Sequence, residues 1–175
     1  MELTSVAAGF AVADAMLKAA SVRLLLSRSI CSGKFMILIG GDTAAVSSAV
    51  ASGAAAAAGC LIDQAVMANL HPDVLEAIGR SNFGEVTGAL GIVESFNVVS
   101  LIEAADAAVK TASVTLLELR LAMALGGKAI AVVTGDIASV QSAVDAARRV
   151  LANAGVLVNA VVLARPHPSV YRELI

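Results

Sequence analysis

The chain contains few of the residues that specify several common classes of protein. Its 175 residues include two cysteines, three prolines, no tryptophan and only 3% aromatic side chains. Two cysteines cannot build the dense disulfide framework of a small secreted domain. A formal net charge of -2 provides no excess of basic side chains for a nucleic acid backbone. We therefore expect no disulfide scaffold and no nucleic acid partner.

An internal repeat is the most informative feature that is present. Residues 2–78 return as residues 94–175, with identical side chains at many matching positions. The identical pairs include Asp14 and Asp106, Lys18 and Lys110, Asp42 and Asp136, and His71 and His167. A repeat of this length indicates a tandem duplication in which one fold is used twice.

The repeat predicts two domains of similar size. We expect the first domain over residues 1–80, a polar linker over residues 81–87 and the second domain over residues 88–175. The second copy opens with an apolar run, residues 88–93, whereas the first copy has only Met1 ahead of its matched block. We therefore expect the first copy to lack its first strand.

The chain is unusually apolar, because charged residues make up 15%, hydrophobic residues 58%, and the mean hydropathy is +0.86. A membrane or a large protein interface must cover this surface. The uncharged run over residues 43–62 is mostly Ala, Ser and Gly, which gain little from lipid, and its repeat over residues 137–156 carries charges. No secretory signal is visible at the start. We predict protein interfaces, no membrane and a cytosolic location.

Each copy is expected to fold as strand, helix, strand, strand, helix, strand. Apolar residues at helical spacing predict first helices over residues 6–19 and 98–111. Short aliphatic runs predict strands over residues 22–28, 35–39 and 61–70, and over residues 114–120, 129–133 and 156–164. Asp42 and Asp136 follow glycines and are expected to cap the second helices. The order indicates an α+β fold with helices on a mostly antiparallel sheet.

The two copies differ in the loop between their middle strands. Residues 29–34 contain Cys31, whereas the longer counterpart, residues 121–128, has no cysteine. An isolated intracellular cysteine is usually an ordinary packed or exposed thiol, and Cys60, which matches Ala154, is interpreted in that way. The asymmetry at Cys31 is where we expect the function to lie.

Other polar residues give no catalytic pattern. His71 and His167 each precede a proline, with no second ligand at metal spacing, and are expected to be structural or to line an edge. The glycine pairs at residues 40–41 and 126–127 lack the context of a nucleotide-binding loop and are read as turns. We expect no enzyme activity, although an enzyme or small-ligand regulatory domain could use the same scaffold if it had a polar cleft.

Several spaced segments resemble the shell-protein domain of bacterial microcompartments, and the resemblance covers both copies. The segments are residues 89–94 (ALGIVE), residues 102–110 (IEAADAAVK), Gly135-Asp136 and Arg165-Pro166-His167. The resemblance implies a tandem of ferredoxin-like βαββαβ shell domains, three chains forming a pseudohexameric disc, and discs tiled into a shell with other shell proteins in the cytoplasm. Such buried interfaces would also account for the apolar composition.

Within that family, the loop Ile30-Cys31-Ser32-Gly33-Lys34-Phe35 is similar to the Ile-Cys-Pro-Gly-Lys-Phe loop of the iron-sulfur shell proteins of propanediol-utilisation microcompartments. The resemblance implies that three Cys31 thiolates meet at the central pore and bind one 4Fe-4S cluster per trimer. The cluster would transfer electrons, or be transferred itself, across the shell, with encapsulated or cytosolic redox enzymes as partners.

The resemblance also assigns the neighbouring residues. The pore loops comprise Ile30, Ser32, Gly33 and Lys34 from the first copy and Met123, Ala124, Leu125 and Gly126 from the second. Gly33 would let a backbone amide approach the cluster, Lys34 would offset its negative charge, and Ser32 in place of proline would leave the loop less rigid. A zinc ion on three thiolates, or an open metabolite pore without a cluster, are the alternatives.

Shell-edge contacts are implied for Lys18, Lys110, Arg165 and His167. For the two lysines the competing interpretation is a solvated side chain near a helix end, where the helix dipole favours positive charge.

Overall fold

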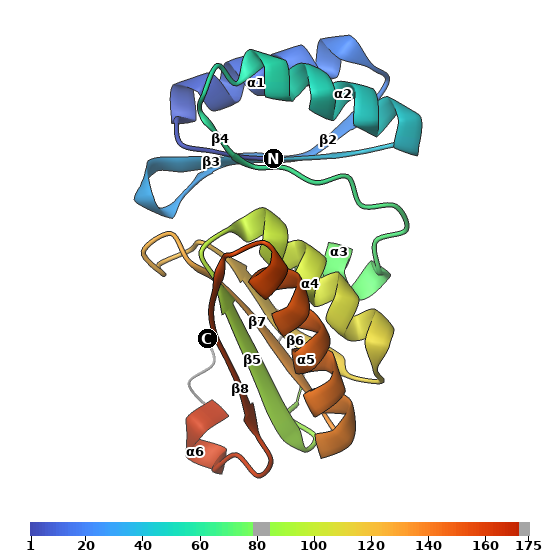
Figure 1. The fold of residues 1–175 in the computed structure, drawn as a ribbon, viewed down its shortest axis with the longest axis vertical. Helices are drawn as coiled ribbons and strands as arrows, with labels where there is room; N and C mark the ends of the chain where they lie inside the picture. The colour runs from blue at the N-terminus through green and yellow to red at the C-terminus, as the bar shows by residue number, and fades with distance from the viewer. Residues whose placement is uncertain (79–84, 172–175) are drawn as a thin grey trace. The chain divides into compact units, whose positions relative to one another are not determined.

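Each copy of the repeat forms a four-stranded antiparallel sheet with two helices on one face, as the computed structural model shows (Figure 1). The strand orders are β2-β3-β1-β4 and β6-β7-β5-β8. The first copy contains β1 (Glu2–Leu3), α1 (Val6–Ala19), β2 (Arg23–Ile30), β3 (Lys34–Gly40), α2 (Thr43–Ala56), β4 (Leu61–Asp63) and α3 (Pro72–Ala77). The second contains β5 (Ala89–Ser95), α4 (Val98–Thr111), β6 (Thr115–Leu121), β7 (Ala129–Gly135), α5 (Ile137–Asn153), β8 (Leu157–Leu163) and α6 (Pro168–Tyr171). The α+β, ferredoxin-like order predicted from the sequence is confirmed.

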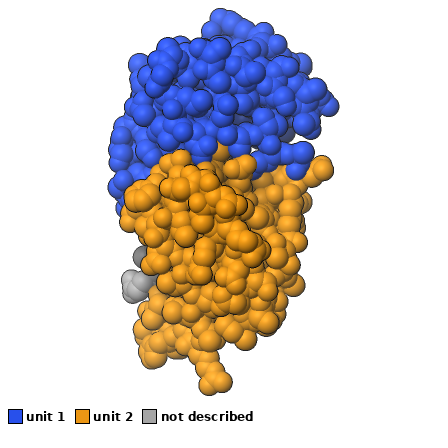
Figure 2. Space-filling model, in the orientation of Figure 1, with its two compact units in different colours: residues 1–68, 124–127 blue, residues 69–123, 128–175 orange. Residues whose placement is uncertain are grey.

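The structure describes residues 1–78 and 85–171, and its chain divides into two compact units (Figure 2). Unit 1 is Met1–Ala68 with Ala124–Gly127, and unit 2 is Asn69–Met123 with Lys128–Ile175. The units differ from the sequence copies because the end of the first copy, including α3, packs within unit 2. The domain boundaries inferred from the repeat therefore stay a prediction.

The predicted helix starts agree with the local hydrogen bonding. Asp42 accepts hydrogen bonds from the amides of Ala44 (2.9 Å) and Ala45 (3.4 Å), and thereby caps α2. Asp136 accepts from Ala138 and Ser139, both at 3.0 Å, and caps α5 in the same way. These bonds satisfy amides of a first helical turn that have no partner within the helix.

The expectation that the first copy lacks its first strand is wrong, since β1 is present but short. The backbone of β1 pairs with β3, and the ladder extends to Met1, whose carbonyl accepts from the amide of Ile37 at 3.0 Å. The predicted strand over residues 61–70 is in turn too long. β4 pairs only with the two-residue β1 and ends at Asp63, whereas β8 pairs with the seven-residue β5 and runs over seven residues.

Two further expectations concern the linker and the membrane. Residues 81–84 of the predicted linker lie outside the described part of the chain, and residues 85–87 form neither helix nor strand. Within the described ranges, no helix is both long and apolar enough to cross a bilayer.

The helix-sheet core of unit 1 is built around a size exchange between the two copies. Phe35 is almost fully buried beneath α1, where a Cβ on Gly9 would lie 2.2 Å from its Cδ1. At the matching positions of the second copy, Leu101 and Ala129 are both fully buried. The large side chain thus comes from the strand in one copy and from the helix in the other, and the volume is conserved, as close-packed cores require.

This exchange predicts that Gly9→Ala destabilises unit 1. Although alanine favours a helix by about 1 kcal/mol over glycine, the clash with Phe35 should outweigh that gain and lower the free energy of unfolding by about 1–3 kcal/mol. Urea unfolding followed by circular dichroism would measure it. Ala11→Gly, at an exposed position of α1, is the matched control for helix propensity. A more stable Gly9→Ala protein would contradict the packing argument.

A second prediction concerns the cap of α5. The hydrogen bond from the Ser139 hydroxyl, aided by backbone amides, lowers the pKa of Asp136 below its ordinary value of 3.8. Because the pKa is lower in the folded state, this contribution to stability is present above the unfolded pKa and is lost as the pH falls through the folded pKa. Asp136→Asn should therefore lose stability at pH 7 but differ little from wild type in strong acid. An equal difference at both pH values, in urea midpoints, would contradict this.

Candidate functional site

Cys31 lies at the tip of the hairpin that joins β2 to β3. Residues Cys31–Gly33 form the turn, in which Ser32 has φ of 65° and Gly33 has φ of 71°. A Cβ added to Gly33 would meet nothing within 4 Å, so the turn is open on that side. Proline, whose φ is fixed near -65°, cannot adopt the observed backbone of Ser32. The turn thus presents a partly exposed thiol on a tight, glycine-assisted reversal.

The second copy contributes a backbone donor to this thiol. The amide of Ala124 donates a hydrogen bond to Sγ of Cys31 at 3.0 Å. Ala124 belongs to the short segment Ala124–Gly127, which is part of unit 1 although it lies between β6 and β7 in the sequence. The resemblance assigned Ala124 to the pore loop, but its residue type does not indicate a hydrogen bond to Cys31. Only the extra length of its loop could have indicated this role.

Lys34, next to the turn, forms an ion pair with a buried carboxylate. Its Nζ lies 2.9 Å from Oε1 of the fully buried Glu2 and 3.4 Å from the carbonyl oxygen of Gly127. The second copy repeats the pair between Lys128 and Glu94 at 2.6 Å. Since a buried carboxylate needs a cationic partner, Lys34 serves as the counter-ion of Glu2.

The other predicted loop residues separate into anchored and exposed positions. Ile30 is buried at the end of β2, whereas Met123 and Gly126 are exposed and Leu125 is half-buried. Ile30 thus fixes the loop to its sheet, and Met123 is the large apolar side chain that the second loop leaves open to solvent.

A single chain does not supply a complete metal site. Within residues 1–78 and 85–171, no group of three His, Cys, Asp or Glu side chains is placed to hold an ion. Cys60 is partly buried against the core cluster of unit 1, in line with the packing role expected of it. Cys31 can contribute one thiolate from an accessible hairpin tip. Its chemistry fits an iron-sulfur or zinc site only when thiolates from several chains converge.

The predicted edge residues are charged groups on the surface. Lys18 forms an i,i+4 ion pair with Asp14 (2.6 Å), and Lys110 forms the matching pair with Asp106 (2.5 Å). Arg165 and His167 are exposed. Nδ1 of His167 accepts from the amide of Ser169 at 3.2 Å, and His71 accepts in the same way from Asp73 at 3.3 Å. Both histidines thus have a structural role at the start of a short helix.

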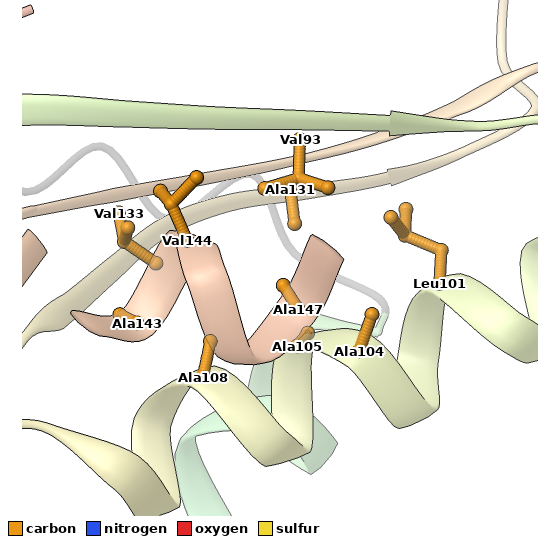
Figure 3. Close-up of a pocket in the computed structure, with 10 residues that line it drawn as sticks. All are labelled: Val93, Leu101, Ala104, Ala105, Ala108, Ala131, Val133, Ala143, Val144 and Ala147. Carbon is orange, nitrogen blue, oxygen red and sulfur yellow. The ribbon is translucent and has the colours of Figure 1, made fainter. Parts of the chain in front are cut away.

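Two hollows in the described part of the chain have mainly apolar walls. Figure 3 shows one enclosed by α4, α5 and the sheet of unit 2, with a cavity volume of about 10 Å³ and apolar walls made mostly of alanine. That space is no larger than one water molecule. A more open hollow of about 230 Å³ is lined by Ile92, Glu94, Ile130, Asn159, Ala160 and Val161. Its one carboxylate, Glu94, is paired with Lys128, so the hollow has no nucleophile and base of the kind an enzyme needs.

Comparison with known proteins agrees with the repeat and the fold. The profile of the BMC domain matches residues 1–70 and again residues 89–166. The chain is 44% identical over 175 residues to the bacterial microcompartment shell protein PduT of Citrobacter freundii, covering 100% of this chain and 95% of that protein. It is 42% identical over 79 residues to the shell protein EutM of Salmonella typhimurium, which is 45% of this chain and 80% of EutM.

Solved structures give the same result. A microcompartment protein from Desulfitobacterium hafniense DCB is 45% identical and superimposes with a TM-score of 0.85 over 98% of this chain and 95% of its own. The fused permuted hexameric shell protein MSM0275 from the RMM microcompartment shares the fold, with a TM-score of 0.66, 22% identity, and coverage of 87% of this chain and 79% of its own. The two matched domains, and 44% identity over the full chain to a shell protein, show that this chain belongs to the BMC-domain family and is a structural shell protein of a bacterial microcompartment.

Proposed function

We propose that three copies of this chain form a pseudohexameric disc in the shell, and that its central pore holds one 4Fe-4S cluster through Cys31. The bound cluster would carry electrons, or be passed on itself, between redox enzymes inside and outside the compartment. The shell protein itself is proposed to be non-catalytic, and its partners are its own copies and other shell proteins.

The observation that carries this proposal is the setting of Cys31. Its thiol is partly exposed at a hairpin tip, beside a glycine with open space around it, and accepts a hydrogen bond from the amide of Ala124. Amide hydrogen bonds to sulfur are a general way in which proteins adjust the potential of iron-sulfur clusters. A thiol that served only to fill a turn would need no such donor.

The number of thiolates follows from the asymmetry of the repeat. Each chain supplies one cysteine at this loop and none at the matching loop of the second copy. Three chains around an axis therefore supply three thiolates, one fewer than the four that usually hold a cubane. The fourth iron would take a non-cysteine ligand and be reachable from the pore, which suits exchange of electrons with a partner.

The outer residues are proposed to act in tiling. Lys18 is a strongly exposed lysine at the end of α1, and Lys110 is its counterpart at the end of α4. Together with the exposed Arg165, they would contact the neighbouring disc along alternating edges.

An open metabolite pore is the second candidate. Exposed Met123 and half-buried Leu125 would give a pore lined partly by apolar side chains, and Cys31 would then be a lining residue without a metal. Bound iron would support the cluster, and its absence would support the open pore. Bound zinc would instead indicate a zinc ion on three thiolates.

Anaerobically purified wild-type protein should contain about four iron and four sulfide per three chains, with a brown absorbance and an EPR signal after reduction. Cys31→Ser should lose the iron, because its hydroxyl is a poor substitute for thiolate. Cys60→Ser is the matched control and should keep it. Equal iron in the two variants, or none in wild type, would refute the cluster at Cys31.

The Ala124 amide gives a further prediction. Ala124→Pro removes the donor to Cys31 and, because φ is 58° at this position, also displaces the loop. Ala124→Gly keeps the amide and suits the positive φ. Loss of the hydrogen bond should make the reduction potential more negative in Ala124→Pro but not in Ala124→Gly. Redox titration of the EPR signal would measure both, and equal potentials in the two variants would show that the amide does not tune the site.

A further inference from the structure

The segment that ends the first copy is buried on the second copy. α3 packs against β6 and α4 within unit 2, and Val74 on α3 has no exposed surface. The amide of His71, just before α3, donates to Oδ1 of Asp106 on α4 at 2.8 Å. α3 is thus held by an apolar contact and by a charge-assisted hydrogen bond.

The same segment at the end of the second copy has no such cover. Val170 on α6 matches Val74 but is 53% exposed. The turn itself is already formed: the amide of Val170 donates to the carbonyl of His167 at 2.8 Å, as the amide of Val74 does to His71 at 3.1 Å. We call residues 167–170 the C-terminal arm. It has the conformation of the buried segment without its binding surface.

In unit 1, the residues that match those near α3 in unit 2 are exposed. Leu24 on β2 is 41% exposed, whereas the matching Leu116 on β6 is 4% exposed. On α1, Phe10 is 66% exposed and its counterpart on α4, Ile102, is 4% exposed. The side chain of Asp14 is 61% exposed, against 15% for Asp106. We call Phe10, Asp14 and Leu24 the acceptor face.

We infer that the C-terminal arm of one chain binds the acceptor face of a second copy, with the contacts that α3 makes on β6 and α4. Val170 would cover Leu24, and the amide of His167 would donate to Asp14 of the other copy. The inference rests on the proposed assembly and supplies its chain-to-chain contact. It also places His167 at the interface between chains of one disc rather than at the edge between discs.

The occupant is a second copy of this chain because the chain carries both halves of the contact. The acceptor face of unit 1 is exposed, and so is the C-terminal arm. The equivalent contact between α3 and unit 2 is formed within the chain. A contact between two different patches is heterologous, so it joins chains head to tail and closes when the rotation per chain divides a full turn. Three such contacts would close the proposed ring.

Matched substitutions at equivalent positions test the contact. Val170→Asp should leave the circular dichroism spectrum unchanged but dissociate the wild-type particle of three 17.5 kDa chains in sedimentation velocity. Val74→Asp, its counterpart, should instead lower the stability of the chain. Asp14→Asn, which only removes a charge, should raise the dissociation constant of the particle by about tenfold.

A mixing experiment tests the head-to-tail arrangement. Leu24→Asp disrupts the acceptor face and Val170→Asp disrupts the C-terminal arm, so each variant alone should be monomeric. Their mixture retains one intact donor and one intact acceptor and should give a two-chain species that cannot close.

An unchanged particle for Val170→Asp and Asp14→Asn, or a mixture that stays monomeric, would overturn the inference. If the trimer survives in all variants, the contact is wrong but the proposed cluster is unaffected. If the mixture gives the two-chain species but the wild-type protein contains no iron, the cluster is wrong and the contact is unaffected.

Discussion

Burial of the short helix that ends each copy is the requirement on which the rest of this structure depends. α3 satisfies it inside unit 2, where Val74 is fully buried and Asp106 holds the backbone of His71. This contact explains why the compact units do not follow the sequence copies, since the end of the first copy is needed to complete the second. Exposed Phe10 and Leu24 add to the apolar surface of the chain, which the proposed contact between chains would cover.

The two copies differ by substitutions that compensate one another in the core. The exchange of Gly9 and Phe35 for Leu101 and Ala129 keeps the core volume of each unit. On the edge strands, Arg120 pairs with the buried Glu118 at 2.5 Å, but the first copy has Leu26 where the second has Glu118. Nε of Arg28, the counterpart of Arg120, is buried without a partner among the described residues. Oε2 of Glu118 is likewise buried without a partner among the described residues, so the edge strand of unit 1 is the less complete of the two in its apolar contacts only.

The fold was largely predictable because its signals are local or repeated. α1 and α4 were placed correctly from helical periodicity, and the caps at Asp42 and Asp136 from residue type. Strand length was not predictable from composition. β4 is short because its partner β1 has only two residues, and that is a property of the pairing rather than of residues 61–70.

The candidate site was predictable only in part for a similar reason. Cys31 stood out because it has no match in the second copy, and the resemblance to a known loop gave it a role. The donor to its thiol is a backbone amide, which every residue except proline possesses, so residue type cannot mark Ala124. Likewise the pairing of Lys34 with Glu2 joins residues far apart in sequence, and only the strand register brings them together.

Fusion of the two copies has a direct consequence for the proposed pore. In a ring of six identical domains every pore loop is the same, so a cysteine in the loop would place six thiols around the axis, and no neighbouring loop could be specialised as a donor. In a ring of three tandem chains the loops alternate, and one copy can supply the thiol while the other supplies the amide. The Cys31 and Ala124 pair is of this kind: one loop is short, ends in a tight turn and carries the sulfur, and the other is longer and reaches it with a hydrogen bond of 3.0 Å. The duplication thus allows a threefold set of ligands with its own set of donors, which a single repeated domain cannot provide.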